Sequence, residues 1–396
     1  MKILAIETSC DETAVAVLEA ECASEKTAFT VLGNALYSQA AKHAEYGGVY
    51  PNLAKREHQE NLVPLTVRAL TEANLLQSAP KPTMINHSGF GGIRDEAFRN
   101  ASIDFVNRYT KPDIDLIAVT SGPGLEPALW TGVSFAEALG AAWDIPVVGE
   151  NHMEGHVVSA LLEKEAADTV VMNRYSIREP EFPVLSLLIS GGHTELVFAG
   201  DWFEYELVGR TRDDAVGEAF DKVARILGLP YPGGPEVAKA AASARARGGK
   251  NPVQLPRPMA GDDTGDFSFS GLKTAALYLV REKNTLSEED IGNVAREFED
   301  AARDVLVAKT ARALEATGAK TLAVGGGVSA NIHIREGLET LIADRFPDVA
   351  LLYPGTDLTG DNAVMIGAAA YLRHQAGKSK TSPKGGLAAK GSLSLA

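Results

Sequence analysis

The sequence predicts an α/β protein made of two similar lobes. Short apolar runs that end in glycine-rich turns alternate with longer segments of helical periodicity, which is typical of α/β folds. The same order of elements occurs in both halves of the 396-residue chain, a length that suggests two or three domains. We therefore expect two duplicated lobes around a central cleft, each offering a glycine-bearing turn to a shared ligand.

The first half contains a strand, a polar turn and a second strand, followed later by a strand, a glycine turn and a helix. The strands are short apolar runs, and the helices repeat apolar residues at steps of three or four. These elements are expected at Lys2–Glu7, Ala14–Leu18, Leu116–Thr120, Gly132–Trp143, Pro146–Gly149 and Glu154–Lys164.

The second half repeats this scheme. The turn SGGHT joins strands at Val184–Ile189 and Glu195–Phe198, and the strand Thr321–Val324 leads through a glycine turn into a helix. A last strand is expected at Ala350–Tyr353. Further helices are expected at Gly271–Lys283, Ile291–Ala316 and Asp361–Gln375.

The pattern also predicts domain limits. Residues 1–150 are expected to form an N-terminal lobe that the C-terminal helix 361–376 completes, and residues 151–360 a C-terminal lobe with helical insertions. Ala79–Pro112 is rich in glycine, asparagine and charge, so we expect a surface insertion there. Residues 377–396 carry four lysines and no acid, which predicts a flexible tail, with an RNA-contacting arm as the alternative.

The composition excludes several classes of protein. No run of 18 apolar residues is present, so no membrane span is expected. Cys10 and Cys22 are too few to staple a fold, and free thiols suit a reducing compartment, which favours the cytoplasm. The formal charge of -14 argues against a general nucleic-acid binder, because such binding needs clusters of lysine and arginine.

The motif NHMEGH, residues 151–156, predicts a metal site. His152 and His156 are four residues apart, so on a helix they project from one face and can bind one ion. Asp361 opens a helix after a strand and a loop, and it is expected as a third ligand, as an N-cap residue, or as both. Glu154 lies about 200° around the helix from His152, which disfavours a zinc protease. Two histidines and one aspartate suit iron(II) as readily as zinc.

Glycine turns in the second half predict an oxyanion or nucleotide site. The turn ISGGHT, residues 189–194, lets backbone N–H groups point inward, although a plain hairpin has the same sequence. GGGVSAN, residues 325–331, follows a buried strand and lacks the lysine of a P-loop. Asp221 and the turn Gly233–Gly234 lie between these motifs and contribute to the same pocket or merely end a helix.

These motifs together resemble a known family. In order they read AIETSCDET, NHMEGH, SGGHTEL, GEAFDKVAR, YPGGP, FSFSGLKTA, GGGVSAN and GDNAVMIG. The chain resembles the bacterial tRNA N6-adenosine threonylcarbamoyltransferases of the actin-like ATPase superfamily, formerly called O-sialoglycoprotein endopeptidases. The resemblance implies two ribonuclease-H-like lobes and acyl transfer from threonylcarbamoyl-adenylate to N6 of adenosine 37, in tRNAs that read codons beginning with A.

The resemblance also assigns residues and a cofactor. One divalent ion per subunit is expected, iron(II) first and zinc(II) as the alternative, with His152, His156 and Asp361 as its ligands. The residues expected to contact nucleotide and substrate are Ile189, Ser190, Gly191, Gly192, His193, Asp221, Gly234 and Asn331. Asp11, in the first polar turn, is our candidate for assisting proton removal from the amine, and a hydrogen-bonding role in the turn is the alternative.

The resemblance further implies partners, namely tRNA, a metal-free paralogous dimer subunit and a small ATPase. Ala54–Leu75 and Gly132–Trp143 are candidate dimer faces. Three other functions remain open at this point: a small-molecule kinase of the same superfamily, a metalloprotease and a non-enzymatic assembly protein.

Overall fold

The computed structural model describes the chain except for residues 24–25, 80–86, 166–172, 284 and 380–385. It consists of two compact units, each with its own β-sheet and its own hydrophobic core. Unit 1 comprises Met1–Ala40, Val49–Arg178 and Gly360–Leu395. Unit 2 comprises Ala41–Gly48 and Glu179–Thr359, together with Ala396.

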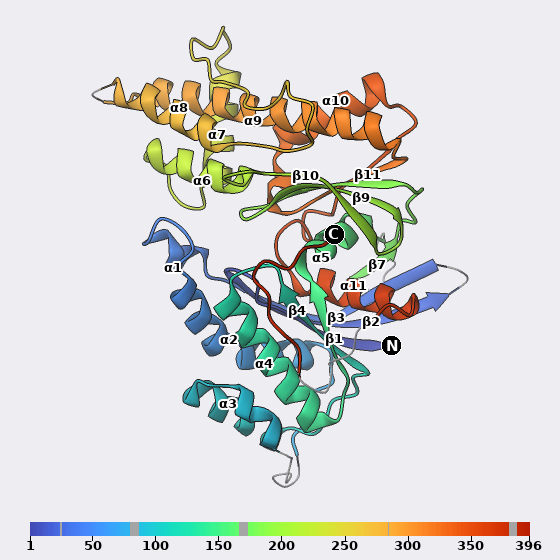
Figure 1. Cartoon of the computed structure of the whole chain (residues 1–396). Helices are drawn as coiled ribbons and strands as arrows, with labels where there is room; N and C mark the ends of the chain where they lie inside the picture. Colours follow the sequence, from blue (N-terminus) through green and yellow to red (C-terminus); the bar gives the residue numbers. More distant parts are fainter. Residues whose placement is uncertain (24–25, 80–86, 166–172, 284, 380–385) are drawn as a thin grey trace. The chain divides into compact units, whose positions relative to one another are not determined.

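Unit 1 is built on a seven-stranded sheet in the order β5-β4-β1-β2-β3-β7-β6 (Figure 1). β1, β4 and β5 run parallel, and β2 is antiparallel to both β1 and β3. The bounds are β1 Lys2–Glu7, β2 Glu12–Ala23, β3 Lys26–Ser38, β4 Leu116–Gly122, β5 Val147–Asn151, β6 Leu162–Lys164 and β7 Arg174–Ile177.

The central strands of this sheet determine where polar side chains gather. β1 and β4 are almost continuously apolar until their last residues because both of their faces are covered. Parallel strands end at the same edge of a sheet, so Glu7 of β1, Thr120 of β4 and Asn151 of β5 lie at one edge.

Helices cover both faces of the sheet in unit 1. One face carries the hydrophobic core, which is covered by α2 (Pro51–Glu72), α3 (Glu96–Arg108) and α4 (Glu126–Trp143). The 3-10 helix η1 (His87–Gly92) packs on the same side, against α3 and α4. α11 (Ala363–Gln375) and α5 (His152–Leu161) pack against each other, and α11 covers β1 and β2. α11 approaches closely at Gly367, where a Cβ atom would lie 2.4 Å from Leu18 Cδ1.

Unit 2 repeats the topology of unit 1. Its five strands have the order β10-β9-β8-β11-β12, with β8, β11 and β12 parallel and β9 antiparallel to its neighbours. This matches β3-β2-β1-β4-β5 in both order and direction, so the predicted α/β fold with a duplicated lobe is confirmed. The bounds are β8 Val184–Ile189, β9 Thr194–Asp201, β10 Glu204–Arg210, β11 Thr321–Gly325 and β12 Ala350–Leu352.

The described part of unit 2 has six helices, of which all but α1 contribute to one core. They are α1 Ala40–Ala44, which begins at the boundary, α6 Val216–Ile226, α7 Gly233–Ala246, α8 Ser270–Arg281, α9 Glu288–Thr317 and α10 Ile332–Arg345, with the 3-10 helix η2 at Gly327–Ala330. α9 begins with a capping box between Ser287 and Asp290 and ends at Gly318, whose φ of 62° closes the helix. Phe298 of α9 contacts Phe220 of α6 edge to face, with ring centroids 4.9 Å apart.

The limits of the two units differ from the predicted division at residue 150. The C-terminal helix lies in unit 1, but so does α5, and unit 1 continues to Arg178 because β6 and β7 extend its sheet. The expected insertion at 79–112 also differs in part. Its residues 80–86 lie outside the described part, whereas Phe98 and Phe105 of α3 are buried in the core of unit 1.

The segment 377–396, which the composition predicts to be a flexible tail, packs in part against unit 1. Residues 380–385 lie outside the described part, but the segment after them is bonded to unit 1: the Lys390 N–H donates to the Ser121 carbonyl, and Ala389 is buried. The flexible tail that the lysine-rich composition predicts therefore does not extend to these residues. Leu387 and Ala389 before Lys390 and Leu393 after it are apolar, which explains how this segment can pack.

Among the helices in the described part of the chain, none combines the length and the apolar character needed to cross a membrane.

Candidate metal centre and ligand pocket

The candidate metal centre in unit 1 begins with the first turn of α5. Asn151 caps this helix, because its Oδ1 accepts hydrogen bonds from the backbone N–H groups of Met153 and Glu154. His152 and His156 follow on one face of the helix, with ring centroids 4.7 Å apart. Both side chains are buried, at 5% and 0% exposure.

Asp361 lies against both imidazoles. Its Oδ1 is 3.1 Å from His156 Nε2 and 3.5 Å from His152 Nε2. The expected capping role belongs to the next residue, since Asn362 accepts a hydrogen bond from the Met365 N–H and α11 begins at Ala363. Asp361 directs its carboxylate at the histidines.

Glu7 completes the centre from behind. Its carboxylate, fully buried at the end of β1, lies 3.0 Å from His152 Nδ1 and accepts a 2.6 Å hydrogen bond from the Thr120 hydroxyl. A carboxylate on the far nitrogen of a metal-binding histidine fixes the tautomer and the ring orientation. The sequence analysis missed Glu7, although an acidic residue that ends a fully buried strand is an unusual feature.

Charge coupling holds this cluster together. Burial lowers the pKa of His152, but the carboxylates of Asp361 and Glu7 outweigh it and raise that pKa to about 9. For Glu7 the opposite balance applies: burial raises the pKa, and the charge and hydrogen bond of His152 bring it below its ordinary value. A divalent cation would therefore displace a proton from this group when it binds.

The donor set fits a divalent metal ion. Nitrogen atoms of the two histidines and an oxygen of Asp361 all lie within 4.8 Å of one another. His156 Nδ1 is buried and has no hydrogen-bond partner in the described part of the chain, so only its Nε2 is engaged, and toward Asp361. Two ligands from α5 and one from the loop before α11 leave coordination positions open, as in catalytic zinc or iron(II) sites.

Glu154 lies away from this centre, as its angular position predicts. Its carboxylate forms a 2.6 Å ion pair with Arg373 of α11. A metalloprotease needs this glutamate beside the metal as a general base. The geometry therefore removes the metalloprotease alternative.

The polar turn after β1 contains Cys10 and Asp11. Burial raises the pKa of the Cys10 thiol well above its ordinary value, and the Asp11 and Asp361 carboxylates raise it further, so Cys10 is a poor nucleophile. The Asp11 carbonyl accepts a 2.9 Å hydrogen bond from the Gln39 N–H, which stabilises the turn. The role of the Asp11 carboxylate as a base stays a prediction.

Unit 2 contains a separate pocket of about 750 Å³. It gathers four of the predicted substrate residues from four motifs: Gly191, Asp221, Gly234 and Asn331. Asp221 accepts a 2.7 Å hydrogen bond from the Gly233 N–H, so it holds the first turn of α7 in addition to lining the pocket. These motifs are far apart in sequence, and the fold brings them together.

The other predicted substrate residues lie differently. Ile189 is fully buried in the core, so only its main chain is available to a ligand. Ser190 Oγ accepts hydrogen bonds from the N–H groups of Gly192 and His193, at 3.3 and 3.1 Å, so these amides are bonded within the turn. Gly192 and His193 line a second pocket of about 540 Å³ beside Arg210.

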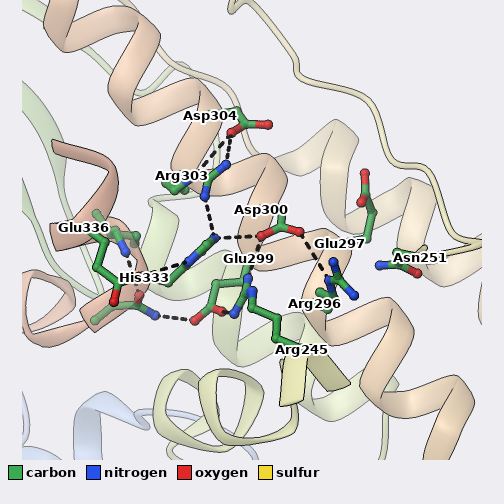
Figure 2. A network of polar contacts seen from close by, with 12 residues as sticks. Arg245, Asn251, Arg296, Glu297, Glu299, Asp300, Arg303, Asp304, His333 and Glu336 are labelled. Atoms are coloured by element: carbon green, nitrogen blue, oxygen red, sulfur yellow. Dashed lines mark hydrogen bonds and ion pairs between the residues drawn. The ribbon is translucent and has the colours of Figure 1, made fainter. Parts of the chain in front are cut away.

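A polar network forms one wall of the larger pocket (Figure 2). Asn331 caps α10 with its Oδ1, which accepts from the Ile334 N–H, and its Nδ2 donates a 2.7 Å hydrogen bond to Glu299 of α9. Glu299, only 1% exposed, also pairs with Arg245 of α7 at 2.5 Å. Glu299 thereby fixes the orientation of the Asn331 amide at the pocket wall.

The network continues to Asp300, the residue after Glu299. Asp300 accepts from Arg245 at 2.6 Å and from His333 at 2.7 Å (Figure 2). Burial raises the pKa of Asp300, but the bonds to His333 and Arg245 outweigh it and hold that pKa well below its ordinary value. The sequence analysis missed Arg245, Glu299 and His333. The signal that could have indicated this network is the pair Glu299 and Asp300, two acidic residues in a stretch of α9 that otherwise faces the core.

The chain is an α/β protein with a duplicated lobe, a candidate metal centre in unit 1 and a ligand pocket in unit 2. The sequence profile of the tRNA N6-adenosine threonylcarbamoyltransferase family matches residues 30–79 and 95–368. The chain therefore belongs to this family of tRNA-modifying transferases, as the motifs predict.

Solved structures resemble the chain more distantly. Component A of (R)-2-hydroxyglutaryl-CoA dehydratase from Acidaminococcus fermentans is 12% identical with a TM-score of 0.46, over 95% of this chain and 99% of that one. A ROK family protein from Streptococcus pneumoniae, in complex with sucrose, is 12% identical with a TM-score of 0.46, over 96% and 100%. YeaZ from Pseudomonas aeruginosa is 16% identical with a TM-score of 0.27, over 52% and 63%.

Proposed function

We propose that the chain transfers the threonylcarbamoyl group from threonylcarbamoyl-adenylate to N6 of adenosine 37, with release of AMP, in tRNAs that read codons beginning with A. Membership of the family carries this proposal. Two features of the chain support it: the donor set of unit 1 suits a Lewis-acidic ion, and the pocket of unit 2 has the size and the polar wall that a nucleotide needs.

The pocket in unit 2 is the proposed adenylate site. The exocyclic amine of adenine is a poor nucleophile, so the acyl group must arrive as an activated mixed anhydride. Asn331 uses its oxygen to cap α10 and one N–H to reach Glu299, which leaves its second N–H for the ligand. Gly191 and Gly234 line the pocket without side chains, which allows a ligand to approach the backbone there.

The turn that follows β8 is the proposed phosphate contact, through Ile189, Ser190, Gly192 and His193. In the structure Ser190 Oγ accepts from two of its amides. Phosphate oxygens are stronger acceptors than a hydroxyl. Binding of the adenylate would therefore transfer these amides from Ser190 to the leaving phosphate, where they stabilise developing charge.

The proposed metal ligands are His152, His156 and Asp361, with Glu7 holding His152. A divalent ion there would polarise a carbonyl oxygen as a Lewis acid, and iron(II) is proposed first with zinc(II) as the alternative. Asp11 is proposed to assist removal of the proton from N6. Replacing Asp11 by Asn should lower the single-turnover rate while adenylate binding stays intact, and an unchanged rate would eliminate the base role.

The partners are proposed in the same way. The family acts on tRNA, and we propose a metal-free paralogous subunit, a small ATPase that completes the assembly, and the cytoplasm as the compartment. The net charge of -14 limits sequence-independent contacts with phosphates. The isolated chain should therefore bind tRNA weakly and the assembled complex more tightly, with an affinity that falls as salt rises.

The test supplies threonylcarbamoyl-adenylate directly to the chain, the partner proteins and unmodified tRNA, with ATP in a parallel sample. Digested nucleosides are analysed by mass spectrometry. Threonylcarbamoyl-adenosine and AMP in equal amounts are expected. Phosphorylation of a small molecule from ATP, without any modified nucleoside, would instead establish the kinase alternative.

A further inference from the structure

A segment near the C-terminus binds to unit 1 beside the candidate metal centre. The Leu387 N–H donates to the Glu137 carboxylate of α4 at 2.5 Å, and the Gly391 carbonyl accepts from the Gly124 N–H at 3.1 Å. Ala389, 6% exposed, belongs to the core of the unit. We call residues 387–394 the C-terminal strap. In Figure 1 its dark red trace runs along α4 toward α5.

Two glycines of unit 1 leave room for the strap. A Cβ atom on Gly122, at the end of β4, would lie 2.1 Å from the Lys390 carbonyl oxygen, which no side chain permits. A Cβ atom on Gly149, in β5, would lie 3.3 Å from Leu387 Cδ2. The strap therefore fits a surface shaped for close backbone approach, at the edge of the sheet where Glu7 and Asn151 lie.

The strap ends at the residue that caps the metal-ligand helix. The Ser394 carbonyl accepts a 3.1 Å hydrogen bond from Asn151 Nδ2. A carbonyl can accept only from the nitrogen end of the amide, so this bond turns Asn151 Oδ1 toward the N–H groups of Met153 and Glu154. His152 lies directly after this cap.

We propose that the C-terminal strap positions the first turn of α5, and with it His152, by fixing the orientation of the Asn151 amide. The effect on metal affinity rests on the proposed function of the centre, whereas the effect on the helix does not. The family match ends at residue 368, so the strap lies beyond the residues on which the family assignment depends.

The first test displaces the strap in the full-length chain. Ala389→Glu places a charge in the core, which should release the strap and increase hydrogen exchange at the Met153 and Glu154 amides by about fivefold, the typical effect of losing a cap. Zinc should bind about tenfold more weakly, as expected when a residue behind a ligand is lost. Lys390→Glu is the matched control, because the Lys390 side chain is exposed and only its backbone bonds to unit 1.

The second test uses the symmetry of a carboxylate. Asn151→Asp replaces the amide with a carboxylate, which has two acceptor oxygens at the helix N-terminus and needs no partner to orient it. In this background Ala389→Glu should no longer change exchange at Met153 and Glu154. Circular dichroism and AMP binding by unit 2 check that each variant is folded.

Equal protection of these two amides in wild type and in Ala389→Glu would overturn the proposal, as would an equal loss in the Asn151→Asp background. If the wild-type chain binds no zinc, the exchange rates alone decide, and the failure then belongs to the proposed metal centre.

Discussion

The two candidate sites are constructed in different ways. In unit 1 a short helix and Asp361, in the loop before α11, bring three metal donors together, and a buried carboxylate at the end of β1 supports one of them. In unit 2 the pocket combines glycine turns with a wall of ion pairs between α7 and α9. The side chains of Arg245 and Asp300 in this wall remain 24% and 21% exposed. The first site depends on close geometry, and the second on a network that water partly reaches.

This difference implies that the sites fail separately. The metal donors all belong to unit 1, and the residues of the pocket network all belong to unit 2. A change at one site should alter its own ligand and leave the other ligand unaffected. Zinc binding and AMP binding therefore serve as independent measures of the two regions.

The largest effect is expected for His156→Ala. Loss of a residue behind a ligand usually weakens metal binding by about 10–100-fold. Loss of one of the three proposed ligands themselves should have a larger effect, so zinc should bind more than about 100-fold more weakly. AMP binding should be unchanged. Isothermal titration measures both. His374→Ala, an exposed histidine in the last turn of α11, is the control and should leave both affinities intact.

Glu7→Gln tests whether the buried carboxylate behind His152 contributes to metal binding. The neutral amide keeps the shape but removes the charge beside His152, so zinc should bind about 10–100-fold more weakly. Glu19→Gln, on the exposed side of β2, should have no effect. Wild-type zinc affinity in Glu7→Gln would show that the carboxylate only stabilises the fold.

The pH dependence of metal binding should reveal the same coupling. The carboxylates of Asp361 and Glu7 raise the pKa of His152 to about 9, so below that pH an ion that binds must displace one proton. Zinc affinity measured against a chelator buffer should therefore rise up to about tenfold per pH unit between pH 7 and 9. AMP binding should show no comparable rise. A flat zinc profile would contradict the raised pKa.

Glu299→Gln tests the wall of the pocket in unit 2. The substitution removes the charge that pairs with Arg245 and loosens the Asn331 amide, so AMP should bind about fivefold to tenfold more weakly, as for the loss of one ordinary hydrogen bond. Glu315→Gln changes an exposed ion pair on the same helix and should change AMP binding little. Reduced zinc affinity in Glu299→Gln would show that the two regions are not independent.

Much of the fold could be predicted from the sequence, because β1 and β8 are continuous apolar runs bounded by polar turns and the same order of elements occurs twice. The histidine pair could also be predicted, since a spacing of four places both residues on one helical face. Glu7 and Glu299 could not, because their roles depend on which strands end together and on which face of a 30-residue helix meets the pocket. The packing of residues 387–394 could not be predicted, because the lysine-rich composition of the tail is typical of a flexible segment.

The most direct test is transfer to tRNA transcripts that differ at a single base. Threonylcarbamoyl-adenylate, the chain and its partners are incubated with a transcript carrying adenosine 37 and with one carrying guanosine there. Mass spectrometry of nuclease fragments should find the threonylcarbamoyl group on adenosine 37 of the first transcript and on no residue of the second. Equal modification of both transcripts, or AMP release without modification of either, would contradict the proposed function.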